Sequence, residues 1–256
     1  MRVLRPYLSQ AMQITKKDAA ISFLSAYSTK NPQALEFIHP RHYQCNKHFQ
    51  YPGLLGFAEK MLRQQQFATE IRPIKVIQDG DFVSALSFIS GVFSGMGIDI
   101  FRFKGSKIIE HWENHETAPA IDLGHSISGI AKSEIQDRNK TESNKKLAVD
   151  FVSDVLIGNN PKLLKKYSHP THFKFYNLHQ KLKEAGTDSM RIIAQNIKKQ
   201  SYHNILHVIG EGNHVNVYSD GIKQGKPYRF CDLFVFIENK IVEHRQIASF
   251  SGANQP

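Results

Sequence analysis

The stretch DIFRFKGSKIIEHWE, Asp99–Glu113, decides the fold because it occurs twice in the chain. The second copy, DLFVFIENKIVEHRQ, begins at Asp232, 133 residues later. In each copy an Asp is followed 12 residues later by a His, and alternating apolar residues flank a short polar turn. This pattern predicts a β-hairpin. Its recurrence over so long a distance predicts two copies of one domain, each close to the usual domain size and each with a candidate site.

The sequence around the hairpin repeats as well. Each copy has a run of helical spacing that breaks at Asn-Pro, then a His-Pro pair, a short extended segment, a further helix and two strands around a turn. Helices followed by four antiparallel strands predict an α+β layered fold. We therefore expect domains at residues 1–118 and 143–256. The stretch between them, residues 119–142, is rich in Ser, Gly and charge, which predicts a linker.

The composition and the charge narrow the class of protein. The chain is 41% hydrophobic and 11% aromatic, which is enough for a folded core in each domain. Residues 143–256 hold 16 Lys/Arg against 9 Asp/Glu, mostly as doublets on predicted helix surfaces. We interpret this excess as a solvated basic face, and we do not expect a nucleic-acid partner because no polybasic run or RNA-binding motif accompanies it.

Cysteine usage and hydropathy predict the compartment. Cys45 and Cys231 fall at non-equivalent places in the two copies, which predicts free thiols in a reducing environment. No segment has the apolar length of a signal peptide core or a membrane span. We expect a cytoplasmic protein without a membrane partner.

Several motifs occur in a fixed order along the first copy: Tyr43-Gln44-Cys45-Asn46, Gly56, Asp79-Gly80-Asp81, Asp99-Ile100-Phe101-Arg102 and Lys107–Glu113. Together they resemble the SnoaL-like polyketide cyclase family of the nuclear transport factor 2-like superfamily. The second copy matches more loosely, and the chain as a whole resembles tandem two-domain members. The resemblance implies two cone-shaped domains, each a curved antiparallel sheet packed on about three helices, with an apolar pocket at the open end.

The resemblance also implies a chemistry. The family closes a ring by an intramolecular aldol reaction without a cofactor, in which a base removes a proton next to a carbonyl. The family's base corresponds to Glu113 here and to Gln246 in the second copy, and a Gln cannot accept a proton. The family's pocket His corresponds to Cys45 in the first copy and Tyr176 in the second, and its hairpin Arg corresponds to Arg102.

We therefore predict that the first domain carries any chemistry, of the aldol cyclase or isomerase type, on a small apolar or aromatic ligand and without a cofactor. The candidate catalytic residues are Glu113, Asp99 and His111. The candidate ligand-binding residues are Cys45, Tyr43, Arg102, Trp112, Asp232, His244 and Tyr176.

The hairpin register decides whether the catalytic candidates meet. His111 and Glu113 are two apart on one strand, so they share a face. A plain two-residue turn places Asp99 opposite Trp112, away from His111, and a bulge would reverse this. The sequence leaves both arrangements open.

Two alternatives to the enzyme remain: a non-catalytic protein, and nucleic-acid binding through the basic second domain, which ranks last. The chain could be a non-catalytic ligand-binding or scaffold protein whose two domains pair as an internal pseudo-dimer, in place of a homodimer. A metal site is suggested by His39-x-x-His42 and His169-x-x-His172, but a Pro interrupts each pair and no further ligand is evident. We expect histidines at helix ends and no metal.

Overall fold

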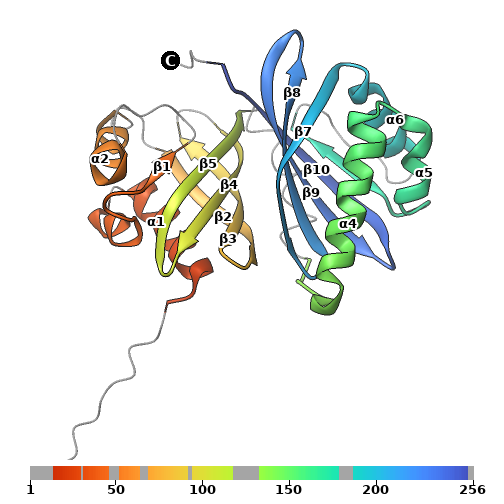
Figure 1. The fold of residues 1–256 in the computed structure, drawn as a ribbon. Helices are drawn as coiled ribbons and strands as arrows, with labels where there is room; N and C mark the ends of the chain where they lie inside the picture. The colour runs from red at the N-terminus through yellow and green to blue at the C-terminus, as the bar shows by residue number, and fades with distance from the viewer. Residues whose placement is uncertain are drawn as a thin grey trace, which may run out of the picture.

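The computed structural model describes residues 14–29, 31–45, 52–63, 69–91, 94–117, 133–178 and 187–252. The chain folds as two tandem α+β domains, each with helices on one face of a curved sheet (Figure 1). Among the described residues, each sheet has five strands. No described helix is long and apolar enough to cross a membrane.

The first domain follows the predicted order of elements. These are α1 (Lys16–Thr29), η1 (Pro32–Phe37), β1 (Gln44–Cys45), α2 (Gly53–Arg63), β2 (Thr69–Asp79), β3 (Phe82–Gly91), β4 (Gly95–Lys104) and β5 (Lys107–Thr117). The strand order is β1-β5-β4-β3-β2. The short strand β1 runs parallel to β5, so the sheet is mixed and not wholly antiparallel as predicted.

The second domain repeats this arrangement. It comprises η3 (Arg138–Lys140), α4 (Thr141–Phe151), the π-helical turn η4 (Val152–Ile157), η5 (Pro161–Leu163), α5 (Leu164–Tyr167), β6 (Lys174–Asn177), α6 (Thr187–Ile197), β7 (Gln200–Glu211), β8 (His214–Lys223), β9 (Lys226–Ile237) and β10 (Lys240–Phe250). The strand order is β6-β10-β9-β8-β7, again with the first strand parallel to its neighbour.

The repeated Asn-Pro pairs start the second helix of each domain. The side chain of Asn31 accepts a hydrogen bond from the backbone N–H of Gln33, and Pro32 occupies the first turn. Asn160 caps η5 in the same way, by accepting from the N–H of Lys162. Pro is suited to this position because its missing N–H would have no partner in a helix's first turn. This part of the prediction is confirmed.

The repeated His-x-x-His motif shapes a turn in each domain. Nδ1 of His39 accepts hydrogen bonds from the backbone N–H groups of Arg41 and His42, both at 3.3 Å. In the second domain Nδ1 of His169 accepts from the N–H groups of Thr171 and His172. The first His of each pair therefore fixes the chain as it leaves the helix, and its Nδ1 lone pair is engaged in that role.

Each hairpin contains a β-bulge that settles the register. Between β4 and β5 the pairing shifts from Arg102 opposite Glu110 to Phe103 opposite Ile108, so one residue is extra on β5. The bulge places Asp99 opposite Glu113. Asp99 therefore shares a face with His111, which is the second of the two arrangements that the sequence left open. The hairpin of the second domain has its bulge at the equivalent place.

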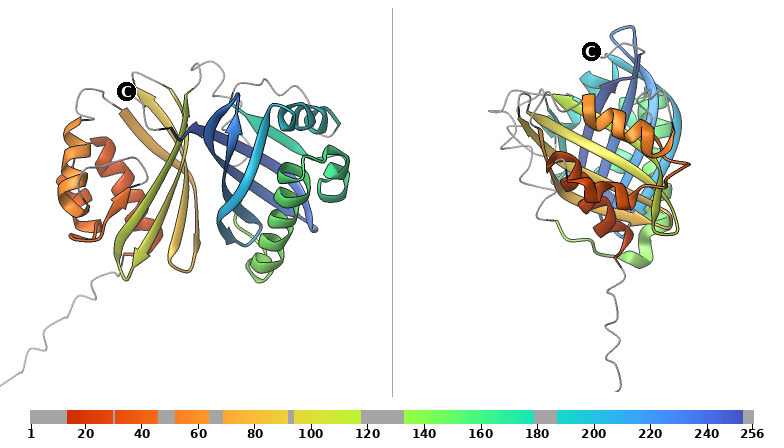
Figure 2. Two further views of the ribbon diagram at one scale, coloured as in Figure 1. Left: turned by 45° about the horizontal axis from the view of Figure 1, so that its top comes forward. Right: turned by 90° about the vertical axis from the view of Figure 1, so that its left-hand side faces the viewer.

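The two sheets pack face to face, with the helices on the outer sides (Figure 2). The apolar layer between them draws buried residues from both sheets, among them Ile98, Ile100, Tyr218 and Leu233. Each domain also has its own core between sheet and helices. One face of each sheet thus builds the domain's interior, and the other face meets the other domain.

Contacts between the domains join equivalent positions of the repeat. Gln78 donates its backbone N–H to Glu211 at 2.8 Å, and Gly210, the equivalent of Gln78, donates to Asp79, the equivalent of Glu211, at 3.1 Å. The side chain of Asn114 donates to the carbonyl of Ile247, its own equivalent, at 3.0 Å. Reciprocal contacts of this kind are those of a twofold interface.

Two ion pairs follow the same rule. Lys17 on α1 lies 2.5 Å from Glu211, and Lys145 on α4 lies 2.7 Å from Asp79. Each lysine comes from the first helix of one domain and reaches the β-turn region of the other. The interface is therefore pseudo-symmetric in its charged contacts as well as in its apolar layer.

The described end of the predicted linker packs on the β7–β8 turn. Gln136 and Asn213 exchange hydrogen bonds, both at 2.9 Å. Gly212 has φ +61°, and a Cβ there would clash with the carbonyl of Gln136, so this close approach requires glycine. Residues 119–132 of the predicted linker lie outside the described residues.

Candidate functional site

The candidate site of the first domain centres on His111 of β5. Nε2 of His111 lies 2.9 Å from Oδ1 of Asp99, and Nδ1 lies 3.1 Å from the hydroxyl of Tyr43. Nδ1 also lies 3.7 Å from Oε1 of Glu113. All four side chains are almost completely buried. The structure therefore brings the three predicted catalytic residues together, because the β-bulge turns them to one face.

Asp99 is held by two histidines. Nε2 of His115, two residues beyond Glu113 on the same face of β5, lies 3.2 Å from Oδ1 of Asp99. Burial alone would raise the pKa of Asp99, but the charge of His115 and hydrogen bonds from His111 and His115 hold it well below its usual range. An ionised carboxylate can only accept, so Nε2 of each histidine carries a hydrogen.

This arrangement fixes the state of the other nitrogen of His111. With Nε2–H donated to Asp99, Nδ1 of a neutral His111 has a lone pair directed toward Tyr43 and Glu113. A buried carboxylate behind an imidazole favours the imidazolium when the ring takes up a proton. His111 is thus poised to accept a proton at Nδ1.

Aromatic rings surround the cluster. Phe101 of β4 stacks on the His111 ring with centroids 4.4 Å apart, and Phe23 of α1 meets the ring edge-on at 5.5 Å. Phe57 of α2 packs edge-on against Tyr43 at 5.8 Å. Cys45, on the parallel strand β1 opposite His111, is partly exposed. The cluster therefore lies in an apolar environment and approaches the surface beside Cys45.

Three of these side chains could hold a metal ion. One ligand atom from each of Cys45, His111 and Glu113 lies within 4.8 Å of the others, and Asp99 backs His111 as a carboxylate often backs a metal-bound imidazole. An ion would have to displace the contact between Nδ1 of His111 and the hydroxyl of Tyr43. This group, and not the His-x-x-His pairs, has metal-binding geometry among the residues that the structure describes.

The second domain keeps the Asp–His pair with other surroundings. Nε2 of His244 lies 2.7 Å from Oδ1 of Asp232, and both side chains are fully buried. The hydroxyl of Tyr202 on β7 donates to Oδ2 of Asp232 at 2.9 Å. Gln246 donates to the same hydroxyl at 2.6 Å and accepts from the side chain of Asn177 at 3.3 Å. A chain of hydrogen bonds thus replaces the acid/base groups.

Nδ1 of His244 faces a different wall from Nδ1 of His111. Phe175 pairs with His244 in β6, at the place that Cys45 takes opposite His111, and its ring lies 4.9 Å from the imidazole. Nδ1 of His244 is buried and has no hydrogen-bond partner among the described residues. This nitrogen is therefore shielded from solvent, and the Asp232–His244 pair is sealed inside the domain.

The strand pairing corrects one equivalence. The resemblance places Tyr176 at the position of Cys45, but Tyr176 pairs with Arg245 and therefore points to the opposite face of the sheet. The guanidinium of Arg245 stacks on the Tyr176 ring at 4.5 Å. The prediction is wrong at this position because the two copies differ in length between this strand and the hairpin, so that Phe175, and not Tyr176, is the equivalent of Cys45.

Two more of the predicted ligand-binding residues lie away from the cluster. Trp112 alternates with His111 and Glu113, so it points to the other domain, where its ring lies 4.6 Å from that of His207. Arg102 pairs with Glu110 at 2.5 Å on a partly exposed face. Cys45 and Tyr43 lie at the cluster.

Two functional neighbours, His115 and Tyr202, were not predicted from the sequence. His115 could have been found, because it continues the alternation of His111 and Glu113 by one more step. Tyr202 had no signal: it reaches Asp232 across an intervening strand, from 30 residues away.

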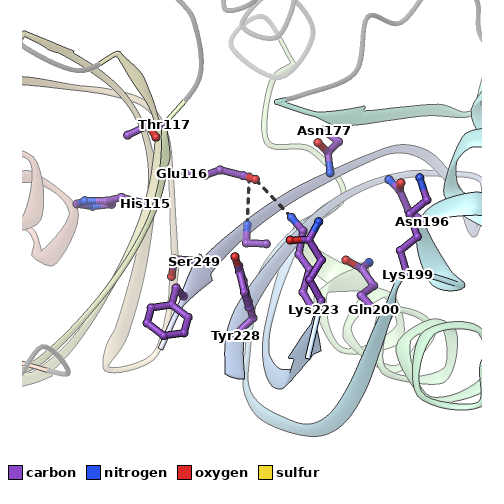
Figure 3. Close-up of a pocket in the computed structure, with 13 residues that line it drawn as sticks. His115, Glu116, Thr117, Asn177, Asn196, Lys199, Gln200, Lys223, Tyr228 and Ser249 are labelled. Carbon is purple, nitrogen blue, oxygen red and sulfur yellow. Dashed lines mark hydrogen bonds and ion pairs between the residues drawn. The ribbon is translucent and has the colours of Figure 1, made fainter. Parts of the chain in front are cut away.

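A separate cavity of about 540 Å³ lies between the domains. Its wall in the first domain is the end of β5, and its wall in the second comes from the ends of β6, α6 and β10 and from the β8–β9 hairpin (Figure 3). Glu116 points across it to Lys223, with Oε1 and Nζ 3.7 Å apart, and accepts from the backbone N–H of Ala248 at 3.2 Å. His115 contributes to the lining but points into the first domain.

Comparison with known proteins gives similarity in structure. No family model matches the sequence, and no curated protein matches it. The chain is similar to a SnoaL-like polyketide cyclase from Agrobacterium tumefaciens, at 12% identity over 44% of this chain and 98% of the other, with a TM-score of 0.36. It is similar to an NTF2-like protein of unknown function from Cytophaga hutchinsonii, at 14% identity over 42% and 95%, with a TM-score of 0.36. A third, TsrD from Streptomyces laurentii, has 22% identity over 44% and 92%, with a TM-score of 0.34.

Proposed function

We propose that the first domain binds a small apolar or aromatic molecule and transfers a proton on it, as an aldol cyclase or isomerase does. The observation that carries this proposal is the buried His111, with Asp99 at Nε2 and with Tyr43 and Glu113 at Nδ1. A paired acid and base in an apolar site is the arrangement that proton abstraction next to a carbonyl requires.

Each residue has a role in the proposed step. Glu113 removes the proton from carbon, which leaves an enolate on the substrate and a neutral acid on the enzyme. His111, 3.7 Å away, takes the proton at Nδ1, and the resulting imidazolium is stabilised by the ionised Asp99. The hydroxyl of Tyr43 lies next to the same nitrogen, Nδ1 of His111. The proton then returns to the product, so no cofactor is consumed.

The apolar walls support this step. Phe23 and Phe101 shield the cluster from water, and in such surroundings a carboxylate is a stronger base than in solution. The same walls suit a ligand that is itself apolar or aromatic.

A non-catalytic role for the second domain follows from a separate observation. Its Asp–His pair faces Phe175 and Gln246, and neither of these side chains can exchange a proton. The reciprocal contacts of Asp79 and Glu211 resemble those between subunits of a homodimer. We propose that the second domain acts as the structural partner of the first, so that the chain is an internal pseudo-dimer.

The proton-transfer proposal is tested with 5-nitrobenzisoxazole, a flat aromatic probe whose ring opens to a coloured phenolate when a base removes its carbon-bound proton. We expect the protein to accelerate ring opening and Glu113→Gln to lower kcat/KM on the order of 100-fold. The matched control is Glu110→Gln, which makes the same change on the same strand but on the opposite face.

Two results would contradict the proposal. One is that Glu113→Gln opens the ring as fast as the unaltered protein, and the other is that Glu110→Gln loses as much. Circular dichroism and urea unfolding establish that both variants are folded.

The pseudo-dimer proposal is tested by sedimentation velocity on the full chain. We expect a compact monomer at micromolar concentration. An obligate dimer of chains would contradict the idea that the second domain replaces a partner subunit.

A further inference from the structure

The cavity between the domains borders the candidate acid/base site at His115 and has a different chemistry. It is lined mainly by polar side chains, and its volume of about 540 Å³ falls within the range for small-molecule sites. Lys199 and Lys223 contribute positive charge, and Glu116 contributes negative charge. The side chain of Glu116 is already held by Lys223 and by the backbone of β10.

The charge of Lys199 is not compensated in the same way. Lys199 follows the end of α6 at Ile197, is exposed, and has no carboxylate partner among the described residues. Since Glu116 offsets only one of the two lysines, the lining keeps an excess of positive charge. A site of this kind attracts an anion.

Amide and hydroxyl groups add directional contacts. Asn177 and Gln200 stand on the wall of the second domain, and the hydroxyl of Tyr228 points into the cavity beside Lys223 (Figure 3). Asn177 is buried and donates to Gln246, so its position on the wall is fixed before a ligand arrives. Groups held in advance bind with less loss of entropy.

Two aromatic side chains supply an apolar surface. Tyr228 and Phe250 lie with ring centroids 6.0 Å apart, and Nζ of Lys223 lies 5.4 Å from the centre of the Tyr228 ring. A ligand with a ring and an acidic group can therefore place the ring against these side chains and the acid near the lysines.

We infer that the cavity between the domains is a binding site for a small organic anion, a carboxylate or a phosphate monoester carried on a ring. Lys199 and Lys223 bind the acidic group, and Tyr228 and Phe250 contact the ring. Because residues of both domains line the site, a bound anion also links the end of β5 to the second domain.

The test is calorimetric titration of the full chain at physiological salt with three probes of similar shape: phenyl phosphate, benzoate and the neutral benzamide. We expect both anions to bind and benzamide to bind at least about 10-fold more weakly, because hydrogen bonds to a charged group are the stronger ones. The ratio between phenyl phosphate and benzoate shows which acid the site prefers.

Substitutions of single lysines test whether the anion binds in this cavity. We expect Lys199→Gln and Lys223→Gln each to weaken binding of the preferred anion about 10-fold, whereas Lys198→Gln, one residue away and not in the lining, leaves it unchanged. Glu113→Gln is expected to leave anion binding intact, so failure of the proposed acid/base function and failure of this site are distinguishable.

Three results would overturn the inference. These are equal binding of benzamide and the anions, equal loss in Lys198→Gln, or no heat from either anion at millimolar concentration. The first would show that the acidic group does not contribute to binding, and the second would indicate non-specific attraction to a basic surface.

Discussion

The two Asp–His pairs occupy the same place in two copies of one fold, but their surroundings differ. Around His111 stand Tyr43, Cys45 and Glu113, all of which can donate or accept a proton. The equivalent positions beside His244 hold the apolar Phe175 and the amide of Gln246. The copies share the pair itself and differ in the chemical groups that could use it.

The contacts of Oδ2 in Asp99 and in Asp232 also differ between the two domains. In the first domain it meets His115, and in the second the equivalent residue is Ala248, so Tyr202 reaches in from β7 instead. Burial raises the pKa of Tyr202, and so does the adjacent Asp232, which keeps its hydroxyl protonated as a donor. We conclude that a buried Asp–His pair can serve a purely structural role in this hairpin. Its presence alone does not mark a catalytic site.

The largest effect is expected where the sealed pair is broken. Asp232→Asn should destabilise the protein by about 3–5 kcal/mol, because His244 and Tyr202 are buried and have no access to water once their acceptor changes. Asp99→Asn should cost less, about 1–3 kcal/mol, since the side chain of His115 is 23% exposed and can turn to solvent. Urea unfolding measures both, and a larger loss for Asp99→Asn would contradict the comparison.

The next effect concerns pH. The second domain has a buried histidine, His214, where the first has Phe82. Its pKa is lowered to about 4, mainly by burial and also by the charges of Lys75 and Lys17, and Glu211 opposes this by raising it. His214 therefore stays neutral in the folded protein over a range in which an unfolded chain would protonate it.

We expect this histidine to make stability depend on pH. Its contribution is fully present above its unfolded pKa of about 6.5 and is lost as the pH falls toward 4, by about 3 kcal/mol in all. His214→Gln removes the titrating group and should flatten the dependence in that window. Urea unfolding at a series of pH values checks this, and an unchanged slope in the variant would show that other groups carry it.

The reciprocal contacts between the domains are expected to differ in strength. The side chain of Glu211 is 8% exposed and that of Asp79 is 26% exposed. Burial would raise the pKa of Glu211, but Lys17 and the N–H of Gln78 lower it, so its charge is well stabilised. Glu211→Gln should cost about 1.5–3 kcal/mol.

Asp79→Asn should cost less, about 0.5–1 kcal/mol. Emission of Trp112, the single tryptophan, reports on the interface because this residue packs against His207. The two variants are compared by urea unfolding followed at that emission. Equal losses would mean that burial does not set the difference.

The smallest effect is expected for Arg102→Gln. Its ion pair with Glu110 is partly exposed and of the kind that contributes about 0–1 kcal/mol. Because this side chain lies away from His111, the rate of 5-nitrobenzisoxazole opening should not change. A loss of rate comparable to that of Glu113→Gln would place Arg102 in the site after all.

Much of the fold followed from the sequence because the repeat exposed it. The Asn-Pro caps, the hairpins and the shared Asp and His depend on local spacing, and the structure contains all of them. The bulge did not follow, since Ile109 and Val242 carry no signal that one residue is extra. The strand pairing in the structure was therefore needed to show that Asp99 and His111 are in contact.

The candidate site followed only in part. Alternation along the strand places Glu113 and His111 on one face and Trp112 on the other. Because this sheet is buried on both faces, the pattern of apolar residues does not indicate which face points into the domain. The face of Tyr176 depended on a gap in the repeat that no motif marks. The interdomain cavity comes from the packing of two sheets, which neither copy encodes alone.

We propose that the Asp99–His111 pair takes part in proton transfer, whereas the Asp232–His244 pair only stabilises the second domain. The most direct test is the rate of 5-nitrobenzisoxazole opening in His111→Asn and His244→Asn, each measured per folded molecule under conditions where circular dichroism shows native structure. We predict a loss on the order of 100-fold for His111→Asn and an unchanged rate for His244→Asn. An equal loss in both variants, or no loss in His111→Asn, would contradict the claim.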